Sequence, residues 1–356
     1  MKVTVITGKE LSPELLGMWR DLQTSNSDLG SPFFHPHFTT LMSDIRGDVE
    51  VALLESGGKL KGFLPFQREQ KSVASAVGGI ISDYQGVICT PSFEFSPIEI
   101  LKGAHLRAWD FDHLITSQSC FQPYHWFVEH SPQIDVSRGY EAYVKERRLA
   151  GSEQLKRIEY LERRIEREVG ALRFVVDATD TESLSTVLSW KSAQYQRTAK
   201  GDLFASGWIR DAVNQLFQTR ADGCSGILSL LYAGDQIVAG HFGLRSKQVW
   251  HYWFPSYNPA LAKHSPGLIL LRKMLEHAPM MGLRIIDLGK GLSPYKERFM
   301  NSSIPLASGR LERFWRAVPR ATWRATRSRL ANSSVGSIAR FVLGKQPRAP
   351  DRVSVL

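Results

Sequence analysis

Apolar residues follow two different periods along the chain, and their succession predicts a mixed α/β protein. Runs of alternating or β-branched residues are followed by runs with apolar residues three and four positions apart, which is helical spacing. In the first third of the chain this pattern predicts helices at 12–23 and 96–106 and strands at 2–7, 49–55, 60–67, 108–115 and 124–129. The turn Ser56-Gly57-Gly58-Lys59 between two of these strands predicts a β-hairpin.

A long charged segment divides the pattern into two halves. Residues 139–168 contain few helix breakers and many charges of both signs, so they predict one long solvated helix that connects the halves. After this segment we expect a strand at 172–176 and helices at 181–198 and 208–221. Three apolar runs with short polar turns then predict an antiparallel meander at 226–232, 236–245 and 248–254.

The meander leads into residues 250–299, which predict strand, loop, helix, strand, turn and helix in that order. Ser265 followed by Pro266 is typical of a helix N-cap and first turn, and a buried strand is expected at 283–288. A βαβ unit usually carries ligand-binding groups at the C-terminal ends of its strands. The groups at that position here are Asp287, Lys290, Tyr295 and Lys296.

Two hairpins, one in each half, have similar sequences. The stretch that begins at Leu53 and the stretch that begins at Leu230 both contain an apolar strand, a glycine turn and a second strand with an early glycine, Gly62 or Gly240. Sequence identity between them is low, and hairpins of this kind are common. The repeat nevertheless favours two similar α/β halves over two unrelated domains.

Composition restricts the class of protein. The three cysteines are scattered, which argues against a disulfide framework or a zinc site, and the N-terminus predicts no signal peptide. The net charge of +10 comes almost wholly from residues 310–356, which hold ten Arg and one Lys against two acidic residues. We therefore expect a near-neutral body with a basic C-terminal helix and tail, and the tail could dock on the body, contact anionic lipid, or bind tRNA or another acidic polymer.

The order of these elements, together with several short motifs, resembles a known family. The motifs are Ser82-Asp83-Tyr84-Gln85-Gly86, Trp190-Lys191, Tyr257, Ser265-Pro266-Gly267, Asp287-Leu288-Gly289 and Tyr295-Lys296-Glu297-Arg298-Phe299. Together they resemble the CelD/BcsL-type GNAT acetyltransferases of cellulose and exopolysaccharide biosynthesis, which are related to the FemAB-like tandem GNAT enzymes. The resemblance implies a tandem GNAT-like α/β fold with two mixed-sheet halves joined by a long charged helix. The expected parts are an N-terminal half at 1–137, a connector at 138–170, an acyltransferase half at 171–311, and a basic tail at 312–356.

The resemblance also implies acetyl-CoA or another acyl-CoA as co-substrate, and no metal. GNAT enzymes usually hold the donor pyrophosphate on backbone N–H groups at a helix N-terminus beside the fourth strand. That position here has a single glycine and a proline, so an ordinary capped helix is the alternative to a donor site. The expected donor-binding residues are His264, Ser265, Gly267, Leu268 and Lys296. Gly289-Lys290-Gly291 lacks the spacing and the Ser/Thr of a P-loop.

Three residues are candidates for catalysis, each with a structural alternative. Asp287 could act as general base or cap the following helix, and His241 could act as general base or lie in the core. Tyr257 could protonate the leaving thiolate or pack in the sheet. The expected substrate-binding residues are Asp83, Tyr84, Gln85, Trp190, Lys191 and Tyr252, of which the first two could reach an interdomain cleft.

These expectations leave three functions open. The first is acyl transfer from acyl-CoA to an amine or hydroxyl of a sugar or polysaccharide precursor. The second is FemAB-like aminoacyl transfer from charged tRNA, and the third is a non-catalytic GNAT scaffold that assists a polysaccharide synthase. We expect a cytoplasmic protein, with attachment to the inner membrane or a synthase complex through the basic tail as a further hypothesis.

Overall fold

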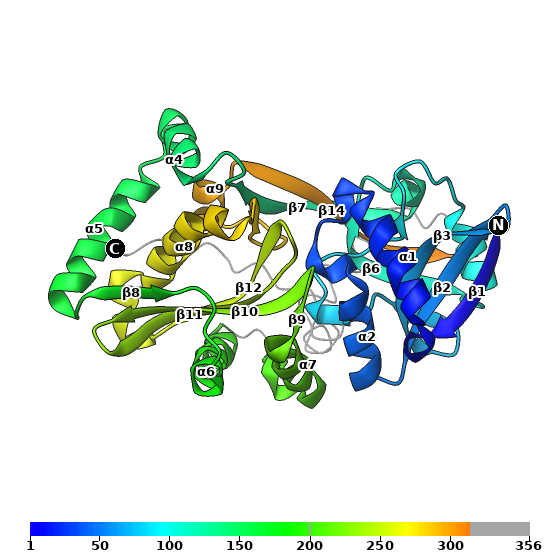
Figure 1. Ribbon diagram of the computed structural model, residues 1–356, viewed down its shortest axis with the longest axis horizontal. Coiled ribbons are helices and arrows are strands. Elements are labelled where there is room, and N and C mark those ends of the chain that lie inside the picture. Colours follow the sequence, from blue (N-terminus) through cyan, green and yellow to red (C-terminus); the bar gives the residue numbers. More distant parts are fainter. Residues whose placement is uncertain (199–200, 314–356) are drawn as a thin grey trace, which may run out of the picture.

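The computed structural model describes residues 1–198 and 201–313, which form one continuous mixed sheet with helices on both faces (Figure 1). The strand order from one edge to the other is β1-β2-β3-β4-β6-β14-β7-β13-β12-β11-β10-β8, with β5 and β9 paired to β3 and β10. The strands are β1 Lys2–Thr7, β2 Val49–Ser56, β3 Lys59–Gln70, β4 Val73–Ser75, β5 Ile88–Cys89, β6 Ala108–Ile115, β7 His125–Asp135, β8 Leu172–Val175, β9 Arg220–Ala221, β10 Cys224–Ala233, β11 Gln236–Arg245, β12 Val249–Tyr257, β13 Ile285–Asp287 and β14 Ser302–Glu312.

The helices pack on this sheet in two layers. They are α1 Pro13–Thr24, α2 Pro36–Ile45, α3 Pro97–Gly103, α4 Tyr140–Leu149, α5 Gln154–Glu168, α6 Thr181–Arg197, α7 Gly207–Gln218, α8 Pro266–His277 and α9 Pro294–Phe299. Residues from α1, α2, α6 and α7 share one hydrophobic core that includes residues from both halves. A second core lies under α4, α5 and α8 in the C-terminal half, and a third lies under α3 in the N-terminal half.

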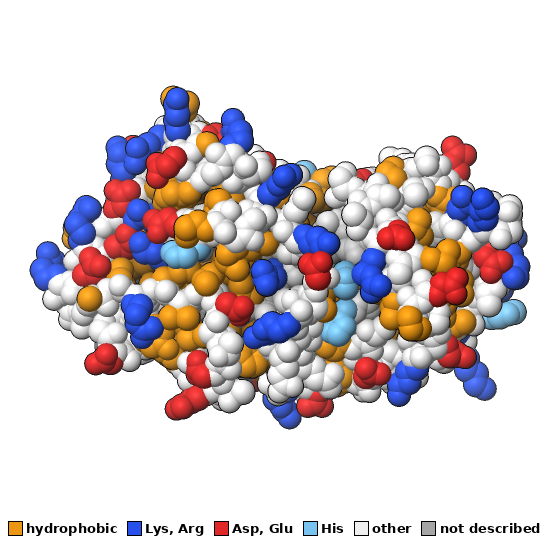
Figure 2. All heavy atoms as spheres, in the orientation of Figure 1, with side chains coloured by type: hydrophobic (Ala, Val, Ile, Leu, Met, Phe, Trp, Pro, Cys, Tyr) orange, Lys and Arg blue, Asp and Glu red, His pale blue; other side chains and the backbone are white. Residues whose placement is uncertain are grey.

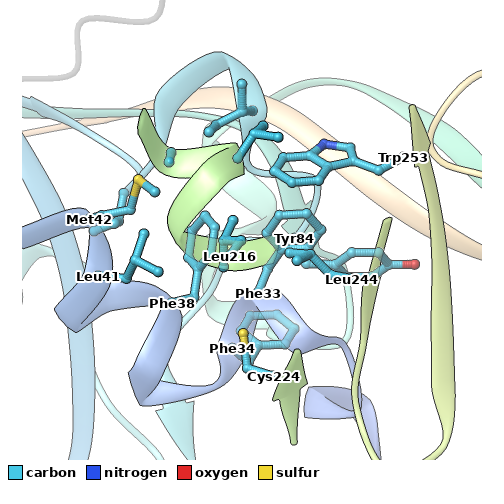
Figure 3. Packing of buried hydrophobic residues seen from close by; sticks show 14 of the residues in the cluster. Phe33, Phe34, Phe38, Leu41, Met42, Tyr84, Leu216, Cys224, Leu244 and Trp253 are labelled. Atoms are coloured by element: carbon cyan, nitrogen blue, oxygen red, sulfur yellow. The ribbon is translucent and has the colours of Figure 1, made fainter. Parts of the chain in front are cut away.

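The shared core shows how the two halves are held together. Phe33 and Tyr84 from the N-terminal half lie beside Leu216, Leu244 and Trp253 from the C-terminal half (Figure 3). The rings of Phe33 and Trp253 meet edge to face with centroids 5.6 Å apart. Burial of aromatic and aliphatic side chains from both halves in one core ties them into a single packed unit.

Strands β7 and β14 join the two halves within the sheet. The C-terminal strand β14 lies between β6 and β7, and β7 continues across to pair antiparallel with β13 over Asp135–Gln133. The sequence did not predict β14, because its alternation is weak. Arg310 and Leu311, which we expected on the basic C-terminal helix, lie in this strand, where Arg310 pairs with Asp110 at 2.6 Å. The rest of the expected basic tail lies outside the described residues.

The connector differs from the expected single helix. Residues 139–168 form two helices, α4 and α5, with a break at Ala150–Glu153. Gly151 there has a φ of 77°, a left-handed value that is readily adopted by glycine but ends a right-handed helix. The break lets α4 and α5 turn separately onto the sheet and bury Tyr143 and Ile158 in the same core.

Most of the predicted elements are confirmed. The hairpin β2–β3, the meander β10–β11–β12 and the parallel pairing of β12 with β13 all lie where the pattern placed them. The two similar hairpins also match in register, because Gly62 lies opposite Leu54 and Gly240 lies opposite Leu230. Each glycine makes room for a neighbour, since a Cβ on Gly240 would approach Val187 to 2.2 Å.

The face of the molecule in Figure 2 shows no dominant charge. Figure 2 shows basic and acidic side chains distributed over both halves, with histidines near their junction. Among residues 1–198 and 201–313, no helix is both long and apolar enough to cross a membrane.

Candidate active site

A buried carboxylate lies at the junction of the two halves. Asp287, the last residue of β13, is fully buried, and donors surround both of its oxygens. Oδ1 accepts from Ser131 Oγ and from Gly289 N, each at 2.8 Å, and Oδ2 accepts from Gln133 Nε2 at 2.8 Å and from the Tyr84 hydroxyl. This many donors compensate for the burial of a carboxyl group.

The local chain geometry explains why these donors meet at Asp287. Asp287 lies opposite Gln133 in the β13–β7 ladder, so side chains on one face of β7 reach it. Gly289 has a φ of 76°, which turns the chain sharply enough for its N–H to point back at the carboxylate. Tyr84 arrives from the N-terminal half, and burial followed by the charge of Asp287 raises its pKa well above the usual value. Tyr84 therefore remains a hydrogen-bond donor.

From Asp287 a chain of polar groups leads toward the surface. His251 of β12 has Nδ1 3.6 Å from Asp287 Oδ1, and its Nε2 lies 2.6 Å from Asp83 Oδ2. Asp83 Oδ1 is 3.6 Å from Nε2 of His113, whose Nδ1 is 2.9 Å from Asp112 Oδ1. The chain therefore alternates carboxylate and imidazole groups from four separate segments, 82–86, β6, β12 and β13.

The ionisable side chains in this row of polar groups stabilise one another's charged forms. Burial lowers the pKa of His251, but the hydrogen bond to Asp83 and the charges of Asp83 and Asp287 outweigh it, so the pKa lies above its ordinary value. Burial raises the pKa of Asp83, but His251 and then His113 outweigh it and the pKa is lowered. Burial also raises the pKa of Asp112, but its neighbours, His113 above all, outweigh burial and leave a pKa of about 2. Asp83 and Asp112 are therefore ionised at neutral pH.

Two predicted residues prove to be packed in the core. His241 is fully buried, stacks on Tyr252 with ring centroids 4.7 Å apart, and accepts the Trp253 N–H at 3.1 Å through Nε2. Burial lowers its pKa to about 3, so His241 is neutral. Burial also raises the pKa of Tyr252 well above its usual value. This environment favours the core alternative for His241, and it places Tyr252, which we expected to bind substrate, in the packed core as well.

The expected donor loop lies between β12 and α8. The 3-10 helix Pro259–His264 ends at Ser265, which has a φ of 49°, and α8 begins at Pro266. The side chain of Ser265 makes no capping hydrogen bond, which corrects the expected N-cap: left-handed backbone differs from the extended conformation of ordinary N-caps. His264 is buried 3.5 Å from Glu168, and Leu268 N donates to Ser265 O at 3.0 Å. Gly267 lies in the first turn of α8, beside Tyr257.

The lysines near Asp287 bind backbone carbonyls. Lys296 Nζ donates to the carbonyls of Gly289 at 2.8 Å and Gly291 at 3.0 Å, and so braces the turn after β13. Lys290 Nζ donates to the Asp112 carbonyl and to Ser308 Oγ at 3.2 Å. The expected role of Lys296 in donor binding stays a prediction, and the structure shows a positioning role for its ammonium group.

The remaining predicted residues lie in the segment 82–86, in α6 and at the end of β12. Gln85 is buried and donates to Asp112 Oδ1 at 2.8 Å, so it fixes the loop to β6. Lys191 of α6 donates to Pro255 O at 3.2 Å, and Trp190 is half-buried on the same helix. Tyr257, at the end of β12, packs against the core under α8. The structure thus brings Asp83, Tyr84, Gln85 and Asp287 together, and Lys296 braces the turn beside them.

Sequence reasoning missed five polar residues of this site. They are Asp112, His113, Ser131, Gln133 and His251. The available signal was a polar residue inside an apolar strand, as in the strands 108–115 and 249–254. Such residues usually have a polar partner when buried, but a single sequence does not show which partner.

Strand β12 extends beyond its parallel partner β13 beside this site. They pair in parallel only at Val249–His251 with Ile285–Asp287, and β12 then continues to Tyr257. In the described part of the chain, the sheet neighbours of β12 are β11 on one side and β13 on the other. The part of β12 after His251 therefore has no strand partner on the β13 side. An extended strand edge can pair with an amide-containing ligand through its backbone groups.

A cavity with a charged lining lies away from this site. It has a volume of about 330 Å³ and lies between α5, α8 and β8. Its charged lining residues largely pair with one another, as Arg272 does with Glu162 and with Glu276 at 3.2 Å. We therefore place the candidate active site at Asp83–His251–Asp287. Within residues 1–198 and 201–313 no group of His, Cys, Asp or Glu residues is arranged to hold a metal ion.

This arrangement of a parallel strand pair, a helix between the two strands and buried polar groups agrees with sequence comparison. Residues 152–297 match the family model described as acetyltransferase (GNAT) domain. The chain therefore carries a GNAT-type acetyltransferase domain, and this domain contains β12, α8 and Asp287. A search among curated proteins finds no significant match.

Solved structures resemble nearly the whole chain. FemX has a TM-score of 0.56 and 9% identity, over 91% of this chain and 99% of FemX. The C-terminal domain of a protein assigned as a lysylphosphatidylglycerol synthetase from Agrobacterium fabrum has a TM-score of 0.53 and 14% identity, over 89% and 98% of the two chains. A tandem GNAT protein of clavulanic acid biosynthesis has a TM-score of 0.49 and 11% identity, over 88% and 99%. The first two likenesses show a shared GNAT-like fold and no more.

Proposed function

We propose that this protein transfers an acyl group, acetyl in the simplest case, from acyl-CoA to an amine or hydroxyl of a sugar or polysaccharide precursor. The observation that carries the proposal is that β12 extends beyond its parallel partner β13 and leads to α8, in the part of the chain that matches the GNAT acetyltransferase domain. The open edge of β12 suits the amides of the donor's pantetheine arm. The first turn of α8, with Gly267, suits its pyrophosphate.

The donor supplies a thioester carbonyl that an acceptor nucleophile can attack. The protein's part is to hold the two reactants together, to exclude water and to accept the proton of the nucleophile. Asp287 is surrounded by donors and fully buried, so we assign it the positioning of Tyr84 and His251 instead of the role of general base. The segment 82–86 brings polar groups of the N-terminal half to the same place, which supports acceptor binding between the halves.

FemAB-like transfer from charged tRNA is the second candidate, and the likeness to FemX over most of the chain supports it. A non-catalytic scaffold that assists a polysaccharide synthase is the third. The basic tail, expected at 312–356, would serve as a contact for membrane or synthase in the first and third cases.

Calorimetry distinguishes these functions. We expect acetyl-CoA to bind the full chain with a dissociation constant in the micromolar range and charged tRNA to bind more weakly. Binding of charged tRNA alone would favour the FemAB-like function, and binding of neither would favour the scaffold. Titrations at two salt concentrations serve as the control, because nonspecific tRNA binding through the basic residues falls steeply with salt.

A further inference from the structure

The outer face of α5 carries a row of basic side chains. We call this row the α5 stripe, and its members follow one another at spacings of four, three and four residues: Lys156, Tyr160, Arg163 and Arg167. This spacing aligns side chains along one face of a helix. All four residues are exposed. The stripe is therefore a cationic surface with one aromatic ring in the middle.

The stripe stands on a firmly packed support. The apolar residues on the opposite face of α5 are buried in the core of the C-terminal half, and they are Leu155, Ile158, Leu161 and Ile165. Arg272 of α8 also holds α5 through ion pairs to Glu162 and, at 3.8 Å, to Glu159. These contacts fix which face of α5 meets the solvent, so the stripe is presented in a defined orientation.

The acidic residues near α5 leave the stripe cationic. Glu159 and Glu162 point to α8, as described above, and Glu166 lines the cavity between α5, α8 and β8. Glu168 ends the helix and is shared by Arg164 at 3.0 Å and Lys263 at 3.1 Å. The contact of Glu153 with Lys156 at 3.0 Å joins two highly exposed side chains and is weak in water.

The corner between α4 and α5 adds an apolar tip to this surface. Leu149, the last residue of α4, is 80% exposed, the highest value among the large apolar side chains that the structure describes. Lys145 and Arg148, close to it on α4, are exposed as well. The chain break after Leu149 leads directly into the first turn of α5. Figure 2 shows Lys and Arg side chains over α4 and α5 at the outer edge of the C-terminal half.

We propose that the α5 stripe and the α4–α5 corner form a docking surface for an anionic lipid membrane. The basic side chains of the stripe contact the phosphates of the headgroups, Leu149 enters the boundary of the acyl chains, and the ring of Tyr160 lies at the interface. The inference goes beyond the proposed function and does not depend on acyl-CoA binding. It also concerns a surface separate from the basic tail expected at 312–356.

The apolar tip favours lipid over nucleic acid as the partner. Both partners offer phosphates to the basic side chains, but RNA presents sugars and base rings, against which an aliphatic tip gains little. A membrane removes the same leucine from water, which is favourable in proportion to the area buried. Docking through α5 would also orient α8, because the two helices are joined by Arg272.

The test measures co-sedimentation of the full chain with large unilamellar vesicles, made of phosphatidylcholine alone or mixed with phosphatidylglycerol as the anionic lipid. We expect at least about tenfold tighter binding to the mixed vesicles. Binding should weaken as the salt concentration rises, because salt screens the attraction between basic side chains and the anionic surface.

Neutralising the stripe should remove most of this binding. A triple variant, Lys156→Gln with Arg163→Gln and Arg167→Gln, loses three charges. Each basic residue near an anionic surface strengthens binding about fivefold, so affinity for the mixed vesicles should fall about 100-fold. Glutamine is a good helix former and the positions are exposed, so the fold should be retained, which circular dichroism checks.

The matched control removes the same number of charges elsewhere. Lys59→Gln with Lys61→Gln and Lys71→Gln changes three exposed lysines of the N-terminal half and should lower affinity by less than about threefold. Both triple variants keep the residues after 313 unchanged, so a difference between them reports on the stripe.

Leu149→Ser tests the apolar tip without any change of charge. It should weaken binding to the mixed vesicles by about fivefold or more, because the tip then has little apolar area to bury. Ile80→Ser, at an exposed apolar position of the N-terminal half, is its control and should bind like the native chain.

Four results would overturn the proposal. They are equal binding of the native chain to neutral and anionic vesicles, equal binding by the two triple variants, normal binding by folded Leu149→Ser, and a larger loss of tRNA binding than of vesicle binding in the stripe variant. The last result would assign the stripe to nucleic acid. Calorimetry with acetyl-CoA tests the proposed function separately, so the two failures are distinguishable.

Discussion

The hydroxyl of Tyr84 provides a direct link between the two halves, and its removal has a calculable cost. In Tyr84→Phe the ring still fills the shared core, but Asp287 Oδ2 loses one of its two donors. A hydrogen bond to a charged group contributes about 1.5–3 kcal/mol when no water replaces it. Tyr84 is 4% exposed, so water cannot take its place.

Three donors remain on Asp287 in this variant, from Ser131, Gln133 and Gly289, so we expect a cost near the lower end of the range, about 2 kcal/mol. For a chain of this size the melting temperature should fall by roughly 3 °C. Urea unfolding and differential scanning calorimetry measure the two quantities.

Tyr160→Phe is the matched control, because Tyr160 lies on the outer side of α5 and is 56% exposed. Its loss of a hydroxyl should change stability by less than about 0.5 kcal/mol. If Tyr84→Phe is as stable as Tyr160→Phe, the buried hydrogen bond between the halves does not stabilise the fold, and the reasoning is refuted.

Three other variants test different parts of the fold. Gly309→Ala should lower the free energy of unfolding in urea by more than about 3 kcal/mol, because the added Cβ would lie 2.1 Å from Tyr124 O. Gly47→Ala is the control, since Gly47 has open space around it, and should cost less than about 1 kcal/mol. Equal costs for the two variants would contradict this prediction. Gly17→Ala, inside α1 with nothing within 4 Å, should stabilise by about 0.5–1 kcal/mol, and a lower urea midpoint would contradict this. His241 has a folded pKa of about 3, below its unfolded value of about 6.5, so it contributes stability above pH 6.5 that is lost as pH falls toward 3. His241→Gln keeps an acceptor for the Trp253 amide, and its urea midpoint should fall less between pH 7 and pH 5 than that of the native chain.

The regular parts of the fold could be predicted because their signals are local. Ser12 before Pro13 gives α1 its N-terminus, and the Ser12 hydroxyl accepts the Leu15 N–H at 3.3 Å as expected of an N-cap. The glycine turns fixed both hairpins, and the meander order indicated the GNAT-like half. The strand β14 was missed because its pairing with β6 and β7 depends on residues almost 200 positions away.

The site could be predicted only in part for a similar reason. Asp287 and the segment 82–86 were recognisable as polar groups at strand ends and in a turn. Their meeting depends on the β13–β7 pairing and on packing between halves, which no local pattern encodes. His251 was hidden in an aromatic strand, and the role expected for Asp287 ignored the donors that close around it.

The central claim is that acyl-CoA binds with its pyrophosphate at the first turn of α8. Gly267→Glu places a carboxylate there, which is favourable for the helix but repels a pyrophosphate. Gly207→Glu, in the first turn of α7, is the matched control. Calorimetric titration with acetyl-CoA should show binding to the native chain and Gly207→Glu with similar affinity, and at least about tenfold weaker binding to Gly267→Glu. Equal affinity for Gly267→Glu and Gly207→Glu would contradict the claim.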